Sequence, residues 1–320
     1  MSETTLSKKE ILFLWDGENW NPNGDMLNSN APRIDEETGV AEATDVRIKR
    51  TIRDELIKKE GSDKVFIKPY KRDENVLDCK TAIRENEINI KQSKDDLEKE
   101  ILERFLDIRA FGGVLPISDK DEMKKDKEIT TAGVQFTGAV QFRMSKSLHK
   151  VSTNHIKGTG AFASNYSDTD TKKQKQQATF REEDFLSYAL FATYGIMDNY
   201  NASKTRFNEE DAQKVIDALW YGTKNLITRS KMGQTPRFML VISYNDDTFA
   251  GDLNNSIDFD GKKDDEAIRN INDYTINFSR LKAKLERYSD AIEKVEYFVD
   301  YDFEENHKEQ FDTSWTKIER

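Results

Sequence analysis

A group of cations stands near the start of a helix predicted over residues 45–59, and its chemistry suits phosphate. The group comprises Arg47, Lys49, Arg50 and Arg53. Residues three or four positions apart share a helix face, and cations near the N-terminus oppose the helix dipole. A bound anion offsets this cost, because backbone N–H groups and guanidinium groups together hold a phosphate. The alternative is a solvated basic face with salt bridges inside the helix.

A second polar group precedes a predicted strand near residue 238. It reads Thr228-Arg229-Ser230-Lys231 and is followed by Gly233 and Pro236. Cations, hydroxyl groups and a flexible glycine suit contacts with a sugar–phosphate backbone. An ordinary turn between a helix and a strand explains the same residues, so both interpretations stay open.

A third group lies on the polar face of strands predicted over residues 130–151. Polar and apolar residues alternate there with the period of a sheet that has one polar face. Sheets that bind single-stranded RNA present such a face, whereas a plain amphipathic hairpin has the same pattern. Gln135, Gln141 and Arg143 fit the face, and Lys146, His149, Lys150, His155 and Lys157 extend it.

Catalytic interpretations have less support. Asp16, Glu18 and Asp25 offer carboxylates for Mg²⁺, and His149 with His155 offers an acid–base pair. Carboxylates in loops usually have no such role, so we predict no catalytic residue and no metal site. We also predict no cofactor, because Gly158-Thr-Gly160 lacks the Lys-Ser/Thr ending of a phosphate-binding loop. Cys79 is the single cysteine, which excludes an internal disulfide and a cysteine zinc cluster.

The net charge of −10 argues at first against a nucleic-acid partner. The acidity is uneven, however: residues 246–320 contain 11 basic and 20 acidic residues, which leaves 39 basic and 40 acidic residues upstream. Basic surfaces can therefore exist in the first three quarters of the chain. No apolar stretch is long enough to cross a membrane and the N-terminus lacks a secretory segment, so we expect a cytoplasmic protein.

The elements that must position these groups alternate between strands and helices. The apolar run 11–15 predicts a buried first strand, and Ile48, Ile52 and Leu56 mark the inward face of the helix over 45–59, with Asp45 as its N-cap. Residues 60–110 look like an insertion with a charged helix around 94–108.

The second half of the chain predicts a further strand and a capped helix. Residues 185–194 suit either a core strand or a core helix, whereas Asn208 caps a helix that runs to about residue 226. The apolar run 238–244 is a strong strand, and residues 246–266 form an acidic loop. This order predicts an α+β fold with a ferredoxin-like or RRM-like sheet and helices on one face.

Several motifs resemble one known family. The signature from Trp15-Asp-Gly-Glu-Asn-Trp-Asn-Pro-Asn-Gly-Asp25 to Thr44-Asp-Val-Arg-Ile-Lys-Arg50 is similar to the N-terminus of CRISPR-associated backbone proteins. These are RAMP-superfamily proteins of the seventh Cas family, in the type I-B and I-C branch. Further matches follow in the family's order: 109–113, 138–143, 147–149, 162–164 and 228–237. Nothing after residue 246 matches.

The resemblance implies an RRM-like palm with inserted fingers and a thumb hairpin. The palm would comprise residues 1–59 and 111–320, the finger region residues 60–110, and the thumb loop residues from about 152 to 178. In the family, copies stack head to tail in a helical filament along a CRISPR guide RNA, whose bases pair with target DNA. Other subunits of Cascade, the type I surveillance complex, would be further partners.

The resemblance implies that the residues that contact the backbone of the guide RNA in the family correspond to a definite set of positions in this chain. These are Asn19, Asn21, Arg47, Lys49, Arg50, Arg53, Gln141, Arg143 and Lys231. The resemblance therefore predicts a non-catalytic, RNA-binding scaffold for antiviral defence. The alternatives are a metal-dependent RNA endonuclease of the type III backbone kind, with Asp25 as its carboxylate, and an assembly scaffold that binds only protein.

Overall fold

One large sheet organises the molecule. The computed structural model describes residues 6–72, 75–76, 78–159 and 180–319. The sheet has the order β18-β17-β14-β1-β13-β11-β5-β4, and β10 and β12 also pair with β13. Its strands are β1 (Lys9–Trp20), β4 (Ile34–Asp35), β5 (Val40–Ala43), β10 (Val140–Phe142), β11 (Ser145–Lys150), β12 (Thr153–Thr159), β13 (Phe180–Met197), β14 (Thr235–Tyr244), β17 (Ile292–Val299) and β18 (Thr316–Lys317).

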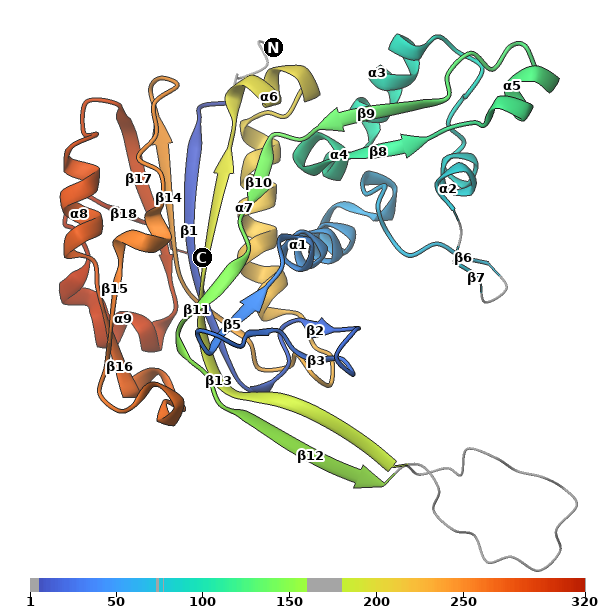
Figure 1. The fold of residues 1–320 in the computed structure, drawn as a ribbon. Helices are drawn as coiled ribbons and strands as arrows, with labels where there is room; N and C mark the ends of the chain where they lie inside the picture. The colour runs from blue at the N-terminus through green and yellow to red at the C-terminus, as the bar shows by residue number, and fades with distance from the viewer. Residues whose placement is uncertain (1–5, 73–74, 77, 160–179, 320) are drawn as a thin grey trace, which may run out of the picture.

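The predicted first strand forms the centre of this sheet. β1 lies antiparallel between β13 and β14 (Figure 1). Alternate β1 side chains enter opposite cores: Phe13 and Trp15 enter one, whereas Leu12 and Leu14 enter the other. Because both faces are covered, the strand appears in the sequence as a continuous apolar run.

Two helices cover the first face of the sheet. α1 (Asp45–Glu60) and α7 (Glu209–Lys224) pack against each other and contribute Ile52, Leu56 and Leu219 to the core. The helices approach closely at Gly222, where a Cβ atom would lie 2.9 Å from the backbone oxygen of Thr51. Asn208 caps α7 as predicted, whereas α1 is capped by Thr44 rather than by Asp45.

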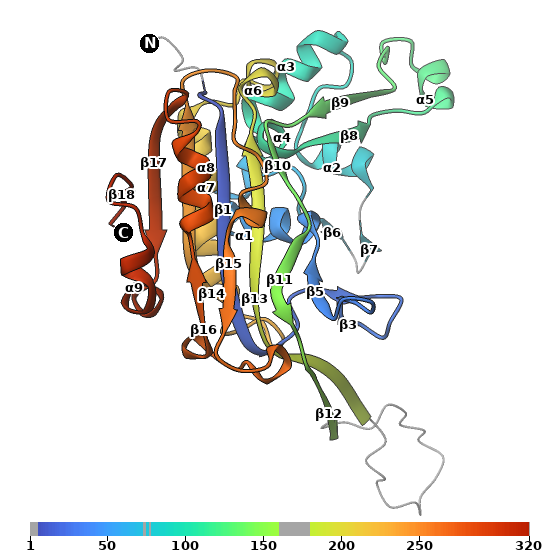
Figure 2. The same cartoon turned by 60° about the vertical axis from the view of Figure 1, so that its left-hand side comes forward.

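The acidic C-terminal quarter covers the second face (Figure 2). It contributes β15 (Asp258–Gly261), β16 (Tyr274–Asn277), α8 (Ser279–Glu286), α9 (Tyr301–His307) and the 3-10 helices 253–256, 265–267, 271–273 and 308–310. Tyr274, Phe278 and Phe303 from this layer are fully buried against the sheet. The quarter therefore completes the hydrophobic core, and the second face is not an open platform.

His149 is buried as a consequence of this covering layer. The prediction placed it on the polar, RNA-facing side of the strands, but only 2% of its surface is exposed. Its ring stacks between Tyr188 and Phe259, with centroid distances of 5.9 and 5.3 Å. This part of the prediction is wrong because Phe259, from the C-terminal layer, covers the ring.

The predicted insertion forms an arm with its own hydrophobic cluster, at the upper right of Figure 1. The arm contains the 3-10 helix 62–64, β6 (Lys71–Arg72), β7 (Asn75–Val76), α2 (Cys79–Glu85), α3 (Lys94–Arg104), α4 (Leu106–Phe111), β8 (Gly112–Pro116), α5 (Lys120–Lys125) and β9 (Gly133–Thr137). The cluster includes Leu115, Ile117 and Val134, so the arm continues past the expected boundary at residue 110.

The remaining elements lie around the lower and upper ends of the sheet. β2 (Gly24–Asp25) and β3 (Ala31–Pro32) form a small hairpin, and α6 (Asn199–Thr205) follows β13. β12 and the first part of β13 form an antiparallel ribbon from Thr153↔Leu186 to Thr159↔Phe180. The rest of the expected thumb loop, residues 160–178, lies outside the described residues. The helices of the described part are all too short or too polar to span a membrane.

Candidate nucleic-acid interface

The start of α1 meets two loops at one end of the sheet. The backbone N–H of Asn21, just after β1, donates to the carbonyl of Ser230 at 2.8 Å. Arg47 donates from Nε to the carbonyl of Pro22 at 3.0 Å and from its terminal nitrogen to the hydroxyl of Thr51. These contacts bring the first and second sequence groups together around Arg47 and Lys231.

Arg47 and Lys231 are two neighbouring cations that no carboxylate of the described residues pairs with directly. Burial lowers the pKa of Arg47 to about 10, with Arg50 adding to the effect and Asp54 opposing it. Burial, followed by repulsion from Arg47, also lowers the pKa of Lys231. Within the described residues, neither side chain has a carboxylate within 4.0 Å. The pair therefore favours a bound anion.

Asn21 and Asn19 shape the surface around this pair. Asn21 is buried; its Nδ2 donates to the carbonyl of Asn30 at 2.7 Å, which holds the β2–β3 hairpin. Asn19 is exposed in the left-handed region at φ 46°, and its Oδ1 accepts from Asn154 of β12 at 3.2 Å. Asn21 is thus a positioning residue, while Asn19 joins the end of β1 to the ribbon.

Lys49 and Arg50 extend the basic surface along α1. Lys49 reaches the sheet edge, where Nζ donates to Oε1 of Gln141 at 3.1 Å and to Asp45 at 3.0 Å. Arg50 is half exposed, and its Nε pairs with Asp54 at 2.8 Å. Arg50 acts electrostatically on Arg47, whereas Lys49 points to the sheet edge, and each already has a carboxylate partner.

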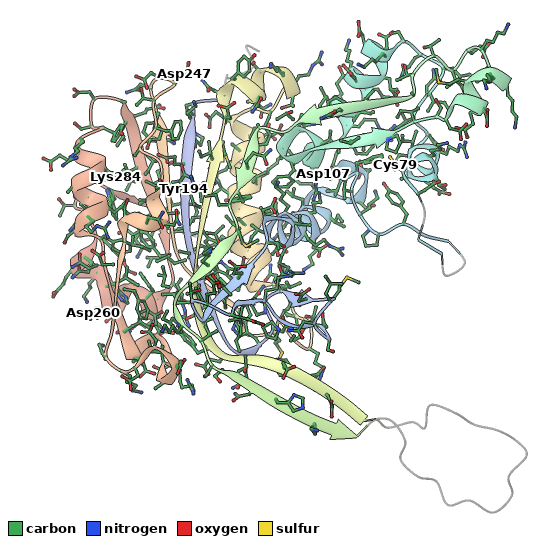
Figure 3. All side chains as sticks on the ribbon, viewed as in Figure 1. Cys79, Asp107, Tyr194, Asp247, Asp260 and Lys284 are labelled. Carbon is green, nitrogen blue, oxygen red and sulfur yellow. The ribbon has the colours of Figure 1, made fainter. Side chains whose placement is uncertain are left out.

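Arg53 lies inside the protein instead. Its Nε donates to Oδ2 of Asp107 at 2.9 Å, and its guanidinium lies 5.0 Å from the ring centroid of Phe111. Asp107, labelled in Figure 3, also accepts the backbone N–H groups of Phe66 and Ile67. Because 7% of Arg53 is exposed, the structure assigns it to the junction between α1 and the arm, and we leave it out of the surface.

Arg143 lies on the sheet face opposite α1. Its guanidinium pairs with Asp252 and lies 5.1 Å from the ring centroid of Tyr194, which is labelled in Figure 3. The hydroxyl of Tyr194 in turn donates to the buried carboxylate of Glu10. Arg143 is therefore separate from the Arg47–Lys231 pair, although Gln141 lies two positions before it.

The carboxylates proposed as metal ligands have other partners. Asp16 is buried and accepts from Arg237 Nε at 2.8 Å and from the Tyr188 hydroxyl at 2.6 Å; burial raises its pKa. Asp25 pairs with Arg33 at 3.2 Å and accepts the backbone N–H of Leu27 in the β2–β3 hairpin. Among the described residues, no group of three or more His, Cys, Asp or Glu side chains is placed to hold a metal.

Sequence reasoning missed the partners of two arginines. Arg229, in the second sequence group, forms a two-pronged pair with Glu183 of β13 at 2.8 and 3.2 Å. Arg237 bridges Asp16 and Asp300, with its second contact at 2.7 Å. The ends of each pair are far apart in the sequence, so no local spacing could have indicated them.

The fold is similar to that of chains solved in CRISPR RNA-guided complexes. One chain, from a "CRISPR RNA-guided surveillance complex, pre-nicking", gives a TM-score of 0.54 at 12% identity and covers 98% of this chain and 96% of that chain. A second, from a "CRISPR RNA-guided surveillance complex", gives 0.51 at 10% identity, with 98% and 95% covered. At these identities the likeness shows the fold alone, which is an α+β fold with one large sheet.

The family follows from the sequence comparisons. The model described as "CRISPR-associated protein Cas7" matches residues 7–279. A CRISPR-associated protein Cas7 of Haloferax volcanii is 32% identical over 305 residues, which are 91% of this chain and 86% of the relative. The chain belongs to the Cas7 family, as its motifs predicted. The match also extends into the acidic quarter, past residue 246 where the motif resemblance ended.

Proposed function

We propose that this chain is a guide-RNA-binding backbone subunit of a type I CRISPR surveillance complex, of the type I-B-like branch. Family membership supports the role, and so does the similarity of its fold to chains of RNA-guided complexes. The observation that carries the proposal is the half-buried Arg47–Lys231 pair, which the contacts of Pro22 and Ser230 bring together and which has no carboxylate within 4.0 Å among the described residues. A guide phosphate would supply a negative charge there, with Asn19, Lys49, Arg50 and Gln141 beside it.

The proposed palm is RRM-like. Along the chain, β1, α1, β11, β13, α7 and β14 follow the order of a βαββαβ unit, and the strands lie in the order β14-β1-β13-β11. We take the arm from about residue 60 to about residue 139 as the fingers and the β12–β13 ribbon as the base of the thumb. The palm then supplies the Arg47–Lys231 pair, which we call the RNA anchor, and the ribbon extends from the same end of the sheet (Figure 1).

In this role the protein binds the backbone of the guide RNA, and base pairing with the guide recognises the target sequence. Copies of the chain would lie head to tail along the RNA in a helical filament and would meet the other Cascade subunits in the cytoplasm. Target DNA would contact the filament through pairing with the guide. The palm would act as a non-catalytic scaffold, and the acidic layer would face a basic surface on a neighbouring subunit.

The test is the loss of RNA binding in Arg47→Glu and Lys231→Glu variants. Binding of a guide-length single-stranded RNA is measured by fluorescence anisotropy over a range of salt concentrations. The double variant should bind about tenfold or more weakly, because charge-assisted hydrogen bonds are lost. Its log–log salt slope should also fall by about 1.4 if two phosphate contacts are lost.

Arg280→Glu is the control for each single variant, since Arg280 pairs with Asp258 in the C-terminal layer and its substitution changes the charge by the same amount as either single substitution. Equal affinities for the double variant and the wild-type chain would refute the proposed anchor. A purified complex that lacks a discrete co-purifying RNA would instead favour a scaffold that binds only protein.

A further inference from the structure

The cations that flank the proposed RNA anchor, the Arg47–Lys231 pair, form ion pairs with carboxylates. Arg50 pairs with Asp54 at 2.8 Å on α1, and Arg229 pairs with Glu183 at 2.8 Å. Lys49, also on α1, pairs with Asp45 at 3.0 Å. Among the described residues, the anchor itself has no carboxylate partner. The basic surface therefore combines one pair of cations without a direct ion pair and several cations that are each paired with a carboxylate.

Two of the compensating carboxylates, Asp54 and Glu183, lie beside the anchor. Asp54 acts on both Arg50 and Arg47, because its charge raises the pKa of Arg47 while burial lowers it. Glu183 lines a pocket together with Asn21 and Ser230, the residues whose backbones join the two loops of the anchor. Asp54 and Glu183 therefore approach the site from two different elements, α1 and β13.

A cation that is already paired with a carboxylate contributes less to phosphate binding than a cation without such a partner. A phosphate that binds Arg50 or Arg229 must displace a carboxylate, so it exchanges one ion pair for another. The displaced carboxylate then remains close to the phosphate and repels it. Each flanking contact thus adds little by itself, and substantial affinity requires a strand that spans several contacts at once.

We propose that Asp54 and Glu183 set a minimum length for the RNA that this chain retains, so that it rejects mononucleotides and short fragments in favour of long single strands. The inference rests on the proposed function and adds selection by length to it. The selecting element is a pair of acidic residues inside a basic surface, which weaken each local contact without blocking a continuous strand.

The experiment compares affinities for a short and a long RNA. Full-length wild-type chain and the variants Asp54→Asn, Glu183→Gln and Asp54→Asn/Glu183→Gln are titrated against single-stranded RNAs of about 6 and about 30 nucleotides. Asp258→Asn is the control, since it also removes one negative charge but frees Arg280 in the C-terminal layer. Circular dichroism and thermal unfolding establish that each variant is folded.

Each single variant should bind the short RNA about twofold to fivefold more tightly than wild type, in keeping with the strength of exposed ion pairs. The double variant should show the largest gain and should bind the short RNA at protein concentrations at which wild type does not. Asp258→Asn should bind the short RNA as wild type does.

Two results would overturn the inference in distinguishable ways. If Asp54→Asn and Glu183→Gln behave like Asp258→Asn while wild type binds long RNA, length selection is wrong and RNA binding stands. If wild type binds neither RNA and no variant gains affinity, the proposed function fails together with the inference.

Discussion

Arg53 of α1 donates from Nε to the fully buried carboxylate of Asp107 in the arm, at 2.9 Å. The second oxygen of Asp107 accepts the backbone N–H of Phe66 at 2.7 Å. The contact joins the helix that carries the proposed RNA anchor to the arm. An arginine that resembles an RNA ligand in the sequence is therefore a structural residue.

Arg53→Ala should lower the free energy of unfolding by about 3–5 kcal/mol, because it leaves the Asp107 charge buried without its partner. Urea denaturation measures the change. Arg50→Ala is the matched control on the same helix; its ion pair is exposed, and its loss should cost less than about 1 kcal/mol. Equal stabilities for the two variants would contradict the assigned role.

Gly222→Val should destabilise the contact between α1 and α7. A Cβ atom at this position would lie 2.9 Å from the Thr51 oxygen and 3.0 Å from the Glu55 Cβ, so the helices must move apart. We expect a loss of about 1–3 kcal/mol in urea denaturation, typical of overpacking.

The same Gly222 variant should weaken RNA binding, because α1 carries Arg47. Gly158→Val in the β12–β13 ribbon is the control for stability, since no other atom lies within 4 Å of its added Cβ. Unchanged stability in Gly222→Val would show that the helices tolerate the larger separation.

His149 should make the stability depend on pH in the mildly acidic range. Burial lowers the pKa of His149 despite the opposing Lys150 carbonyl and Asp265 carboxylate. The unfolded chain therefore takes up the proton first, so the contribution is complete above about pH 6.5 and decreases as the pH falls.

Urea denaturation between about pH 5 and about pH 7 should show a shallower pH dependence for His149→Phe than for wild type. Phenylalanine keeps a ring between Tyr188 and Phe259 but does not titrate. His155→Phe, at an exposed position of the ribbon, is the comparison. If the two variants show the same slope, the assignment to His149 is wrong.

Incubation of the purified complex with complementary RNA and Mg²⁺ should leave the RNA intact. Asp25, the carboxylate of the nuclease alternative, pairs with Arg33 at 3.2 Å and caps the turn of its own hairpin. Gel electrophoresis of labelled RNA measures cleavage, with Asp25→Ala alongside. Cleavage by wild type that disappears in Asp25→Ala would establish the type III-like activity instead.

The sequence predicted elements whose patterns are local. The apolar run of β1, the inward face of α1 and the Asn208 cap of α7 all appear where expected. β13 was undecided because a strand buried on both faces has no period, and its pairing with β1 resolves it. The cap of α1 differed by one residue because Thr44 and Asp45 are both good N-cap residues.

The basic surface around Arg47 was less predictable, because its residues contact residues that are distant in the sequence. Arg47 and Lys231 could be named from their types, but their proximity depends on the loops that Asn21 and Ser230 join. The burial of Arg53 depends on Asp107, 54 positions away. The burial of His149 depends on Phe259, in a region that had no recognisable motif.

The layer over the second sheet face has a consequence for the choice of guide. The described aromatic side chains of β1, β10, β13 and β14 are all buried, so the described part of these strands exposes no ring on which a base could stack. The cations around the anchor are ammonium and guanidinium groups, which suit contacts with the phosphates of a strand. Under the proposed function, such a surface would accept guides that differ in sequence, because base pairing and not the protein distinguishes them.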